Sequence, residues 1–581
     1  MSICLPKEIK DTFIRAVKDG RITPEALSNL SGEERNAFFE QVVGKEAAST
    51  VNALFESKLL LKNQEQGFIT AIKEVAGLKP AVQKDLISKI QKLGKVLDPA
   101  EKEAFMQDLA SQKLGTSVTV DEAKKISELA TLAKDAKSKI TADMPDGSAA
   151  RIDYGTKDIA LNNYVNELKL IAQHETPKQT LEKFGKAPLK TLKEQVSQLA
   201  GIAKGIKASL DNSAIFRQGW KTLFTNPQIW GDNAAKSFVN IAKQLGKEAT
   251  DNTVIDGVKA EIISRQNAIN GIYKDMKLDI GNLEEAFPTT LPEKIPLFGR
   301  LYKASETAYT GFLYKMRADI ADKMIQIAKE TGVDITNKSE LESIGKLVNS
   351  LTGRGNLGSL EKVGKDINTV FFSPKMLKAN LDFLTAHQLQ NNVTPFVRKQ
   401  AAINLLKVTS GIATILSIAY ALDPKSVEWD PRSADFGKIR VGNTRFDVSG
   451  GMGSLVTLAS RQITSSSKSS TTGKVTKLGE RDRTGKLKFG TKTRGDVMFD
   501  FMENKYAPLA SVVKDLRDGQ DFNGNKPTLP NELNNLLTPL PIQNLLQSAQ
   551  DPKHADLLLI GIADGLGIST NTYGNPKKNA K

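Results

Sequence analysis

The segment that most constrains the fold is an apolar run at residues 401–422, which ends abruptly at Asp423 and Pro424. Its last 15 residues, 408–422, carry no charge, whereas a helix that crosses a membrane needs about 20 apolar residues. Lys407 interrupts the longer run. We therefore expect a fully buried core helix of a large helical protein here, rather than a membrane-active segment.

Small side chains recur at every fourth position of this run, at Ala413, Ser417 and Ala421. Residues four apart share one face of a helix, and small side chains there let a second helix approach closely, in a membrane or in water. These three residues are therefore candidates for helix packing or membrane contact.

The residues after the apolar run predict a tight β-hairpin. Residues 438–441 and 444–448 alternate in character, and they flank Gly442 and Asn443. This pair can take the positive φ angles of a two-residue hairpin turn. An apolar helix followed by a hairpin is the expected local structure.

Helix-start patterns punctuate the chain up to about residue 400. Thr119 and Glu122 have the spacing of a capping box. In Ser373-Pro374 and Thr394-Pro395, proline would be the first residue of a helix, where a backbone N–H has no intrahelical acceptor. The sequence predicts a mainly α fold, with a multi-helix elongated or bundle-like architecture and a small β-hairpin insertion near residues 437–490. Expected helices include residues 120–140, 157–173, 232–249, 254–278, 300–331, 337–352, 374–386 and 395–422.

Two loops rich in Gly, Pro and Asp, at residues 142–155 and 287–299, predict domain boundaries. The expected domains are an N-terminal helical domain at 1–142, a middle helical domain at 156–287 and a C-terminal helical domain at 299–575. The C-terminal domain would carry the hairpin and a basic loop at 462–494. The last eleven residues are expected to form a frayed tail.

The net charge of +15 favours acidic partners, either nucleic acid or an anionic surface. Cys4 is the single cysteine, so no internal disulfide is expected, which suits a reducing compartment. A proline and charged residues occur within the first eight residues, which therefore lack the apolar core of a signal peptide. Secretion by the standard N-terminal route is not expected.

Residues 462–494 hold nine Lys or Arg against two acidic residues. The segment predicts either a flexible arm or a hairpin with strands near residues 474–478 and 486–489. Its cations would bind phosphates without reading sequence; the alternative is a solubilising loop. The candidate DNA-binding residues are Lys468, Lys474, Lys477, Arg481, Arg483, Lys486, Lys488, Lys492 and Arg494.

No motif predicts catalysis, a metal site or a cofactor. The three histidines, His174, His387 and His554, have no metal-ligand spacing and are expected at the surface or at helix ends. Residues 353–358 match G-x-G-x-x-G, but an expected helix precedes them rather than a strand, which favours a helix C-cap and turn over a nucleotide site. Trp220 and Trp230 are expected in the core rather than as a base-stacking platform.

Five stretches of the sequence carry a family likeness: residues 51–64, 299–309, 352–358, 368–374 and, most distinctively, 430–447. In these stretches the chain resembles the large polyvalent protein-associated helical domain, a module of tailed-phage and mobile-element proteins. The resemblance covers most of the chain and implies a phage origin and a mostly helical accessory protein carried in the virion or delivered from it. It assigns no catalytic residue.

The leading hypothesis is a non-enzymatic bacteriophage internal virion protein, packaged and ejected with the genome, that contacts DNA and the host envelope. Expected partners are other virion proteins, non-specific nucleic acid, a membrane and further copies of the chain. Expected locations are the virion and, after delivery, the host cytoplasm or envelope. Two alternatives remain: a structural head or tail component, and a phage enzyme such as a nuclease or peptidoglycan hydrolase, which would need acids converging in a cleft.

Overall fold

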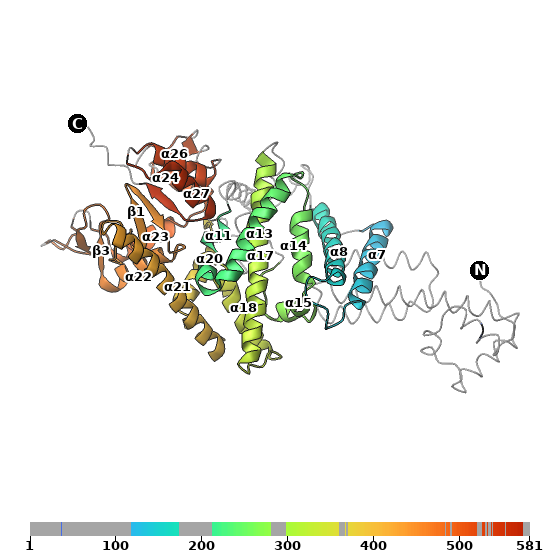
Figure 1. Ribbon diagram of the computed structural model, residues 1–581. Coiled ribbons are helices and arrows are strands. Elements are labelled where there is room, and N and C mark those ends of the chain that lie inside the picture. The colour runs from blue at the N-terminus through green and yellow to red at the C-terminus, as the bar shows by residue number, and fades with distance from the viewer. Residues whose placement is uncertain are drawn as a thin grey trace. The chain divides into compact units, whose positions relative to one another are not determined.

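The computed structural model describes residues 37, 118–173, 212–280, 298–358, 367 and 370–572, with gaps at 483, 489–490, 520–525, 529–530, 533–535, 537 and 552. This part of the chain is mainly helical, as predicted, with a small β insertion (Figure 1). The chain divides into two compact units, Met1–Glu175 and Thr176–Lys581. This division differs from the three domains that the sequence suggests.

In the first unit, α7 (Val120–Ser138) and α8 (Ala149–Gln173) pack against each other. The predicted capping box is present, since Thr119 N–H donates to Glu122 Oε2 at 2.7 Å and Thr119 Oγ1 accepts from Glu122 N–H at 3.3 Å. Buried Arg151 donates to the carbonyl oxygens of Met144 and Thr141 in the connecting loop. The predicted boundary at residues 142–155 therefore lies within one compact unit.

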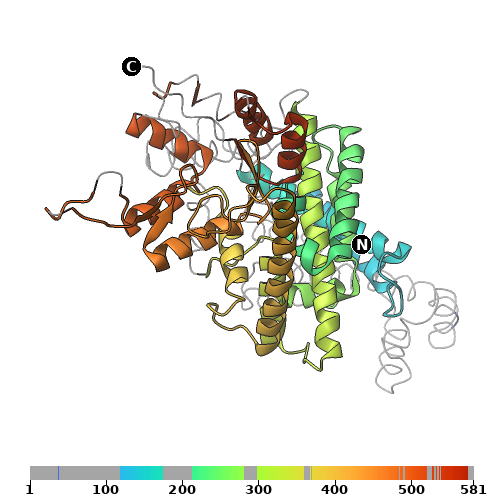
Figure 2. The same cartoon turned by 60° about the vertical axis from the view of Figure 1, so that its left-hand side comes forward.

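The core of the second unit is built around α17 (Phe298–Glu330). Its apolar positions, among them Tyr309, Phe312 and Met316, recur at helical spacing and are buried. Helix α13 (Pro227–Leu245) lies alongside α17 in both views (Figure 2). Other helices that contact α17 are α11 (Ala214–Arg217), α14 (Thr253–Ile263) and α18 (Lys338–Leu351), and α12 (Trp220–Thr225) packs on α13.

The helix expected over residues 254–278 is broken into α14, α15 (Gln266–Ile269) and α16 (Ile272–Asp275). The break falls at Arg265, whose backbone is extended, with φ −67° and ψ 150°. Its guanidinium donates to Asp319 at 2.7 Å and Asp322 at 2.9 Å, both on α17. These tertiary ion pairs give a physical reason for the departure from one continuous helix.

Helices α20 (Pro374–Leu384) and α21 (Pro395–Leu422) both begin at a proline, as predicted. The residues before them, Ser373 and Thr394, have side chains that could cap these helices but make no side-chain capping hydrogen bond. Thr394 instead donates its N–H to Ser343 Oγ of α18 at 2.9 Å. The start of α21 is thereby tied to the core.

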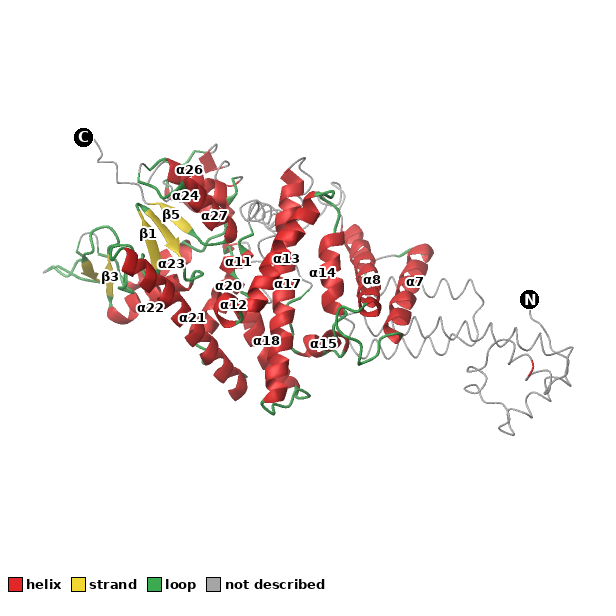
Figure 3. Cartoon of the chain, in the orientation of Figure 1, coloured by secondary structure: helices red, strands yellow, loops and turns green. Residues whose placement is uncertain are grey.

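The predicted hairpin is present as β1 (Lys438–Val441) and β2 (Thr444–Asp447), paired antiparallel (Figure 3). In its turn Gly442 has φ +59°, and a Cβ there would lie 2.3 Å from Lys553 O, so both conformation and space require glycine. A third strand, β5 (Thr570–Thr572), pairs antiparallel with β2. The frayed-tail prediction is therefore wrong for Asn571 and Thr572, and residues 573–581 lie outside the described part.

Helices return after the sheet. One of them, α24 (Pro508–Asp518), begins at Pro508, a position where the N–H that proline lacks would have no intrahelical partner. The described C-terminal helices are α22 (Met452–Thr464), α23 (Arg494–Glu503), α24 (Pro508–Asp518), α26 (Leu540–Ala549) and α27 (Leu557–Leu566).

Candidate functional site

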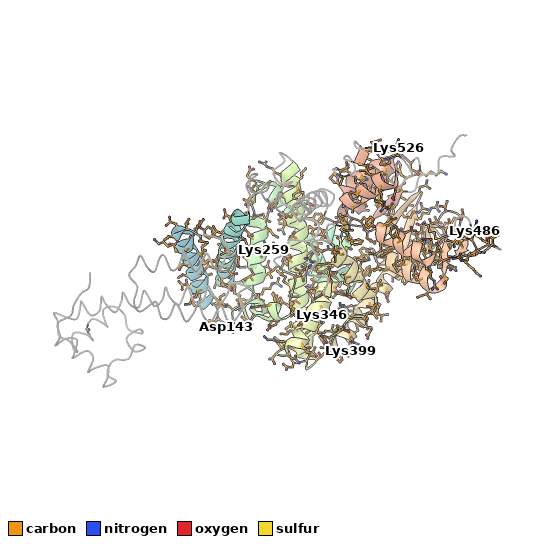
Figure 4. All side chains as sticks on the ribbon, turned by 180° about the vertical axis from the view of Figure 1, so that it is seen from behind. Asp143, Lys259, Lys346, Lys399, Lys486 and Lys526 are labelled. Atoms are coloured by element: carbon orange, nitrogen blue, oxygen red, sulfur yellow. The ribbon has the colours of Figure 1, made fainter. Side chains whose placement is uncertain are left out.

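The basic segment is folded into hairpins rather than a flexible arm. Strands β3 (Ser466–Lys468) and β4 (Val475–Lys477) pair antiparallel, and Arg481 forms an isolated bridge with Leu487. The strand expected near 474–478 is present, but its partner is β3 and not residues 486–489. We call residues 466–494 the basic hairpin region. It projects from the second unit, and Lys486 lies towards its outer end (Figure 4).

Three of the nine candidate cations are paired within the chain. Lys468 Nζ lies 2.7 Å from Glu428 Oε2, and Lys492 Nζ lies 2.6 Å from Asp500 Oδ2. Lys488 pairs with Glu480. Their charge is largely compensated locally, so they add less attraction for phosphates than their number in the sequence suggests.

Three other lysines are exposed and uncompensated: Lys474, Lys477 and Lys486 have no carboxylate within 4.0 Å among the described residues. The hydrogen bond from Lys488 is the main cause that lowers the pKa of Glu480, and the charges of Lys477 and Lys474 act in the same direction. Lys474, Lys477 and Lys488 therefore gather near one carboxylate, which leaves an excess of positive charge.

Two exposed arginines of the basic hairpin region are held by neutral groups. Arg481 donates to Gly485 O at 2.6 Å, and Arg494 donates to Ser465 Oγ. Both keep their charge and remain available to an anion. Arg483, the ninth candidate, lies outside the described residues.

Helix α21 is not a fully buried core helix, and that prediction is wrong. Only 11% of its most apolar 18-residue window is buried, and it is the one described helix long and apolar enough to cross a membrane. One face packs on the core through Val397, Ala401, Val408 and Leu416. At Gly411 a Cβ would lie 2.1 Å from the Phe224 ring, so α12 approaches this face closely.

The opposite face of α21 is exposed, and it carries apolar side chains together with the hydroxyl groups of residues such as Thr409, Ser410 and Thr414. Ala413, Ser417 and Ala421 all lie there, so no described helix of the chain packs on the small-residue stripe. Leu406 and Ile418 are 67% and 58% exposed, and Leu422, the last residue of the helix, is 84% exposed. The sequence identified the apolar character of this helix, but it could not reveal that only one face is covered.

The glycine-rich stretch at residues 353–358 forms a helix end, as expected. Helix α18 stops at Leu351, and Gly353 has φ +81°. At Gly355 a Cβ would lie 2.4 Å from the backbone N of Ala379 on α20, so this glycine permits close packing rather than ligand access. Arg354 Nε lies 2.6 Å from Asp279 Oδ2, which links the turn to the core.

A buried polar cluster, absent from the sequence-based predictions, joins α12 to α20. Lys221 Nζ donates to Ser350 O at 2.7 Å and Asn380 Oδ1 at 3.1 Å, and burial lowers the pKa of Lys221 to about 7. His387 lies just after the C-terminal end of α20, at a helix end as expected, but it is fully buried rather than exposed, and burial lowers its pKa. Asp382, also buried, pairs with Lys378. No sequence spacing indicates that these groups meet.

His554 is half-buried just before α27, and its Nδ1 lies 2.5 Å from Ala555 O. His174 lies outside the described part of the chain. Trp220 and Trp230 belong to the core, as expected, and each ring packs against Phe216 at centroid distances of 5.3 and 5.2 Å. Within the described ranges, no three His, Cys, Asp or Glu side chains are grouped to hold a metal ion.

A cleft of about 1120 Å³ lies among α20, α23, α24, α26 and β5. Most of its lining is apolar, including Phe371, Leu377 and Leu455, so it offers mainly hydrophobic contact. The side chains with a formal charge at neutral pH that line it are Arg217, Lys378, Lys505, Asp515 and Glu532.

Comparison with known protein families, with characterised proteins and with solved structures found no match for this chain. Its function therefore has to be argued from its own surfaces, of which the basic hairpin region and the exposed face of α21 are the most distinctive.

Proposed function

We propose that this chain is a non-enzymatic protein that binds nucleic acid through phosphate contacts made by the basic hairpin region. The observation that carries the proposal is the exposure of Lys474, Lys477 and Lys486 on a projecting hairpin, without carboxylate partners in the described residues. Arg481 and Arg494 add two exposed charges held by neutral groups. A contact of this kind reads charge and not base sequence.

The test is binding of the full chain to duplex DNA of unrelated sequences at rising salt. Wild-type affinity is expected to fall steeply and equally for all sequences, because each phosphate contact contributes about −0.9 to the slope of log K against log salt. Replacing Lys474, Lys477 and Lys486 together with Ala should make the slope shallower by about 2 to 3.

The matched control is Lys274→Ala/Lys323→Ala/Lys329→Ala, which removes three exposed lysines from α16 and α17, outside the basic hairpin region. We expect this control to change the slope less than the hairpin variant does. Equal slopes in the hairpin variant and the wild type would remove the basic hairpin region from the proposed function.

A second candidate function, favoured by the exposed face of α21, is contact with an anionic lipid bilayer. No acidic residue occurs between Pro395 and Leu422, while Arg398, Lys399 and Lys407 lie on the helix. An apolar face with cations and no acids suits the interface of an anionic membrane. Because its other face packs on the core, α21 in this fold would lie on the bilayer surface.

Vesicles of phosphatidylcholine with and without phosphatidylglycerol test this contact. The wild type is expected to co-sediment with the anionic vesicles, and Ile418→Lys should weaken binding by placing a charge on the exposed apolar face. The control Gln326→Lys adds the same charge at an exposed position of α17 that does not line a groove. If Ile418→Lys binds as well as the wild type, α21 does not contact the membrane.

We further propose that the chain acts as a phage internal virion protein, ejected with the genome and associated with other virion proteins. This placement rests on the family resemblance of residues such as 430–447, together with the basic charge. Mass spectrometry of purified virions of the encoding phage is the test. Absence of the chain from the particle would exclude a packaged role and leave the nucleic-acid contact to be judged on its own.

A further inference from the structure

A second basic surface lies far in sequence from the hairpins, in a groove of about 500 Å³ between α13 and α14. Its floor is α17, which contributes Gly311, Phe312 and Lys315. We call it the α13–α14 groove. Its lining holds four lysines, Lys236, Lys243, Lys247 and Lys315, against one carboxylate, Glu261.

Two of the four lysines are already compensated. Lys247 Nζ lies 3.2 Å from Asp251 Oδ2, and Lys315 pairs with Glu261. Burial raises the pKa of Glu261, but the hydrogen bond and charge of Lys315, with Arg265 and Lys236, outweigh it and lower that pKa overall. Glu261 therefore stays ionised and held on the wall of the groove.

Lys236 and Lys243 have no carboxylate within 4.0 Å in the described part of the chain. They lie seven residues apart on α13, which is about two turns or roughly 10 Å along its axis. Asn240 lies between them on the same face and also lines the groove. No hydrogen-bond partner of its side-chain amide is found among the described residues. Two cations and one amide donor thus share one helix face without a bound acceptor.

Glycines lie on one wall and on the floor of this groove. Gly257, inside α14, has no atom within 4 Å of the position that a Cβ would take, and Gly311 lies inside α17. At Gly311 a Cβ would lie 3.2 Å from Asn240 Nδ2, so a larger residue would press on the amide. Because glycine weakens a helix interior, the presence of two helical glycines around the same groove fits a site that admits a ligand.

We propose that the α13–α14 groove binds a phosphate group, with Lys236 and Lys243 pairing with its oxygens and Asn240 donating an amide hydrogen bond. Phosphate suits this lining because it accepts several charge-assisted hydrogen bonds at once. A free phosphate ion and the phosphate of a nucleotide share this chemistry.

The experiment uses the full chain carrying Lys474→Ala, Lys477→Ala and Lys486→Ala, so that the basic hairpin region does not compete. Inorganic phosphate and adenosine 5′-monophosphate are titrated by calorimetry at an ionic strength held constant with sodium chloride. Binding of either probe is expected, with tighter binding of the monophosphate pointing to a nucleotide and equal affinity pointing to free phosphate. Both results support the groove.

The decisive variant is Asn240→Asp, which keeps the side-chain shape and places a carboxylate between the two lysines. It should weaken phosphate binding by about tenfold or more, as expected for the loss of a charge-assisted hydrogen bond. Lys236→Ala/Lys243→Ala should weaken it as well, whereas the control Lys274→Ala/Lys323→Ala should not.

Circular dichroism and a thermal melt check that each variant is folded. Asn240→Asp and Lys236→Ala/Lys243→Ala change different residues, so each tests the groove even if the other does not fold. The proposal is overturned if phosphate gives no heat beyond that of chloride, or if folded Asn240→Asp binds as the wild type does. These outcomes do not bear on DNA binding by the hairpins, which the salt titration tests separately.

Discussion

Asp279 lies where three cations meet in the core. Arg354 Nε is 2.6 Å from its Oδ2, Lys375 Nζ is 3.6 Å away, and fully buried Arg317 donates to its carbonyl oxygen. Burial alone would raise the pKa of Asp279, but the charges of Arg354 and Arg317 outweigh it and lower that pKa. The cluster connects the end of α16 with the turn after α18. At this scale the sequence is least informative, because none of these residues is close to another in the chain.

The buried Lys221 predicts an unusual dependence of stability on pH. Its pKa is about 7 in the folded chain, lowered by burial, against 10.5 ordinarily. Between these values Lys221 holds a proton in the unfolded chain but not in the folded chain. The free-energy cost of burying Lys221 should therefore fall as pH rises, so that the free energy of unfolding increases by at most about 1.4 kcal/mol per pH unit. Below pH 7 both states are protonated and the contribution is constant.

Urea denaturation of the wild type and of Lys221→Met at pH 7 and pH 9.5 measures this effect. The rise in unfolding free energy between the two pH values should be larger in the wild type. Identical changes in the two proteins would mean that Lys221 keeps its proton in the core.

At the scale of single elements, the two faces of α21 differ in what they contribute. Leu416 is 4% exposed and Leu406 is 67% exposed, although both are leucines of the same apolar helix. Leu416→Ala should destabilise the second unit by about 2 to 4 kcal/mol, since it leaves a cavity against the core. Leu406→Ala should change stability by no more than about 0.5 kcal/mol.

Thermal or chemical denaturation of the two alanine variants compares these faces directly. Similar losses from both substitutions would show that a further copy of the chain covers the exposed face in solution, and a concentration-dependent melting temperature would then accompany them.

Sequence patterns predicted most of the described helices because their causes are local. The Thr119 capping box, the prolines that begin α20 and α21, and the apolar spacing of α17 all act within a few residues. The hairpin β1–β2 was predicted with its strand positions for the same reason. What escaped prediction depends on distant partners, such as the break at Arg265 imposed by Asp319 and Asp322.

For the candidate sites, the residues could be identified from the sequence, but their surroundings could not. It identified all nine cations of residues 462–494, yet only the fold shows that Lys468, Lys488 and Lys492 are paired. The α13–α14 groove was not predicted, although Lys236, Asn240 and Lys243 have a helical spacing that could have revealed a polar face. Its second wall and floor come from elements that no local pattern relates to α13.

At the scale of the whole molecule, the charge of +15 is spread over separate surfaces. The basic hairpin region and the α13–α14 groove hold lysines without a carboxylate partner among the described residues. Other cations, such as Arg265, Arg317 and Arg354, are buried and form ion pairs or hydrogen bonds in the core. The net charge therefore does not show where an acidic partner would bind, and the surfaces have to be tested one at a time.

The order of strands β1-β2-β5 has a consequence for synthesis of the protein. Strand β2 ends at Asp447, but the strand that covers its free edge begins only at Thr570. A ribosome must therefore translate every helix from α22 to α27 before this sheet can close. Until then the nascent hairpin exposes an unpaired edge, which a chaperone or a neighbouring nascent chain could occupy.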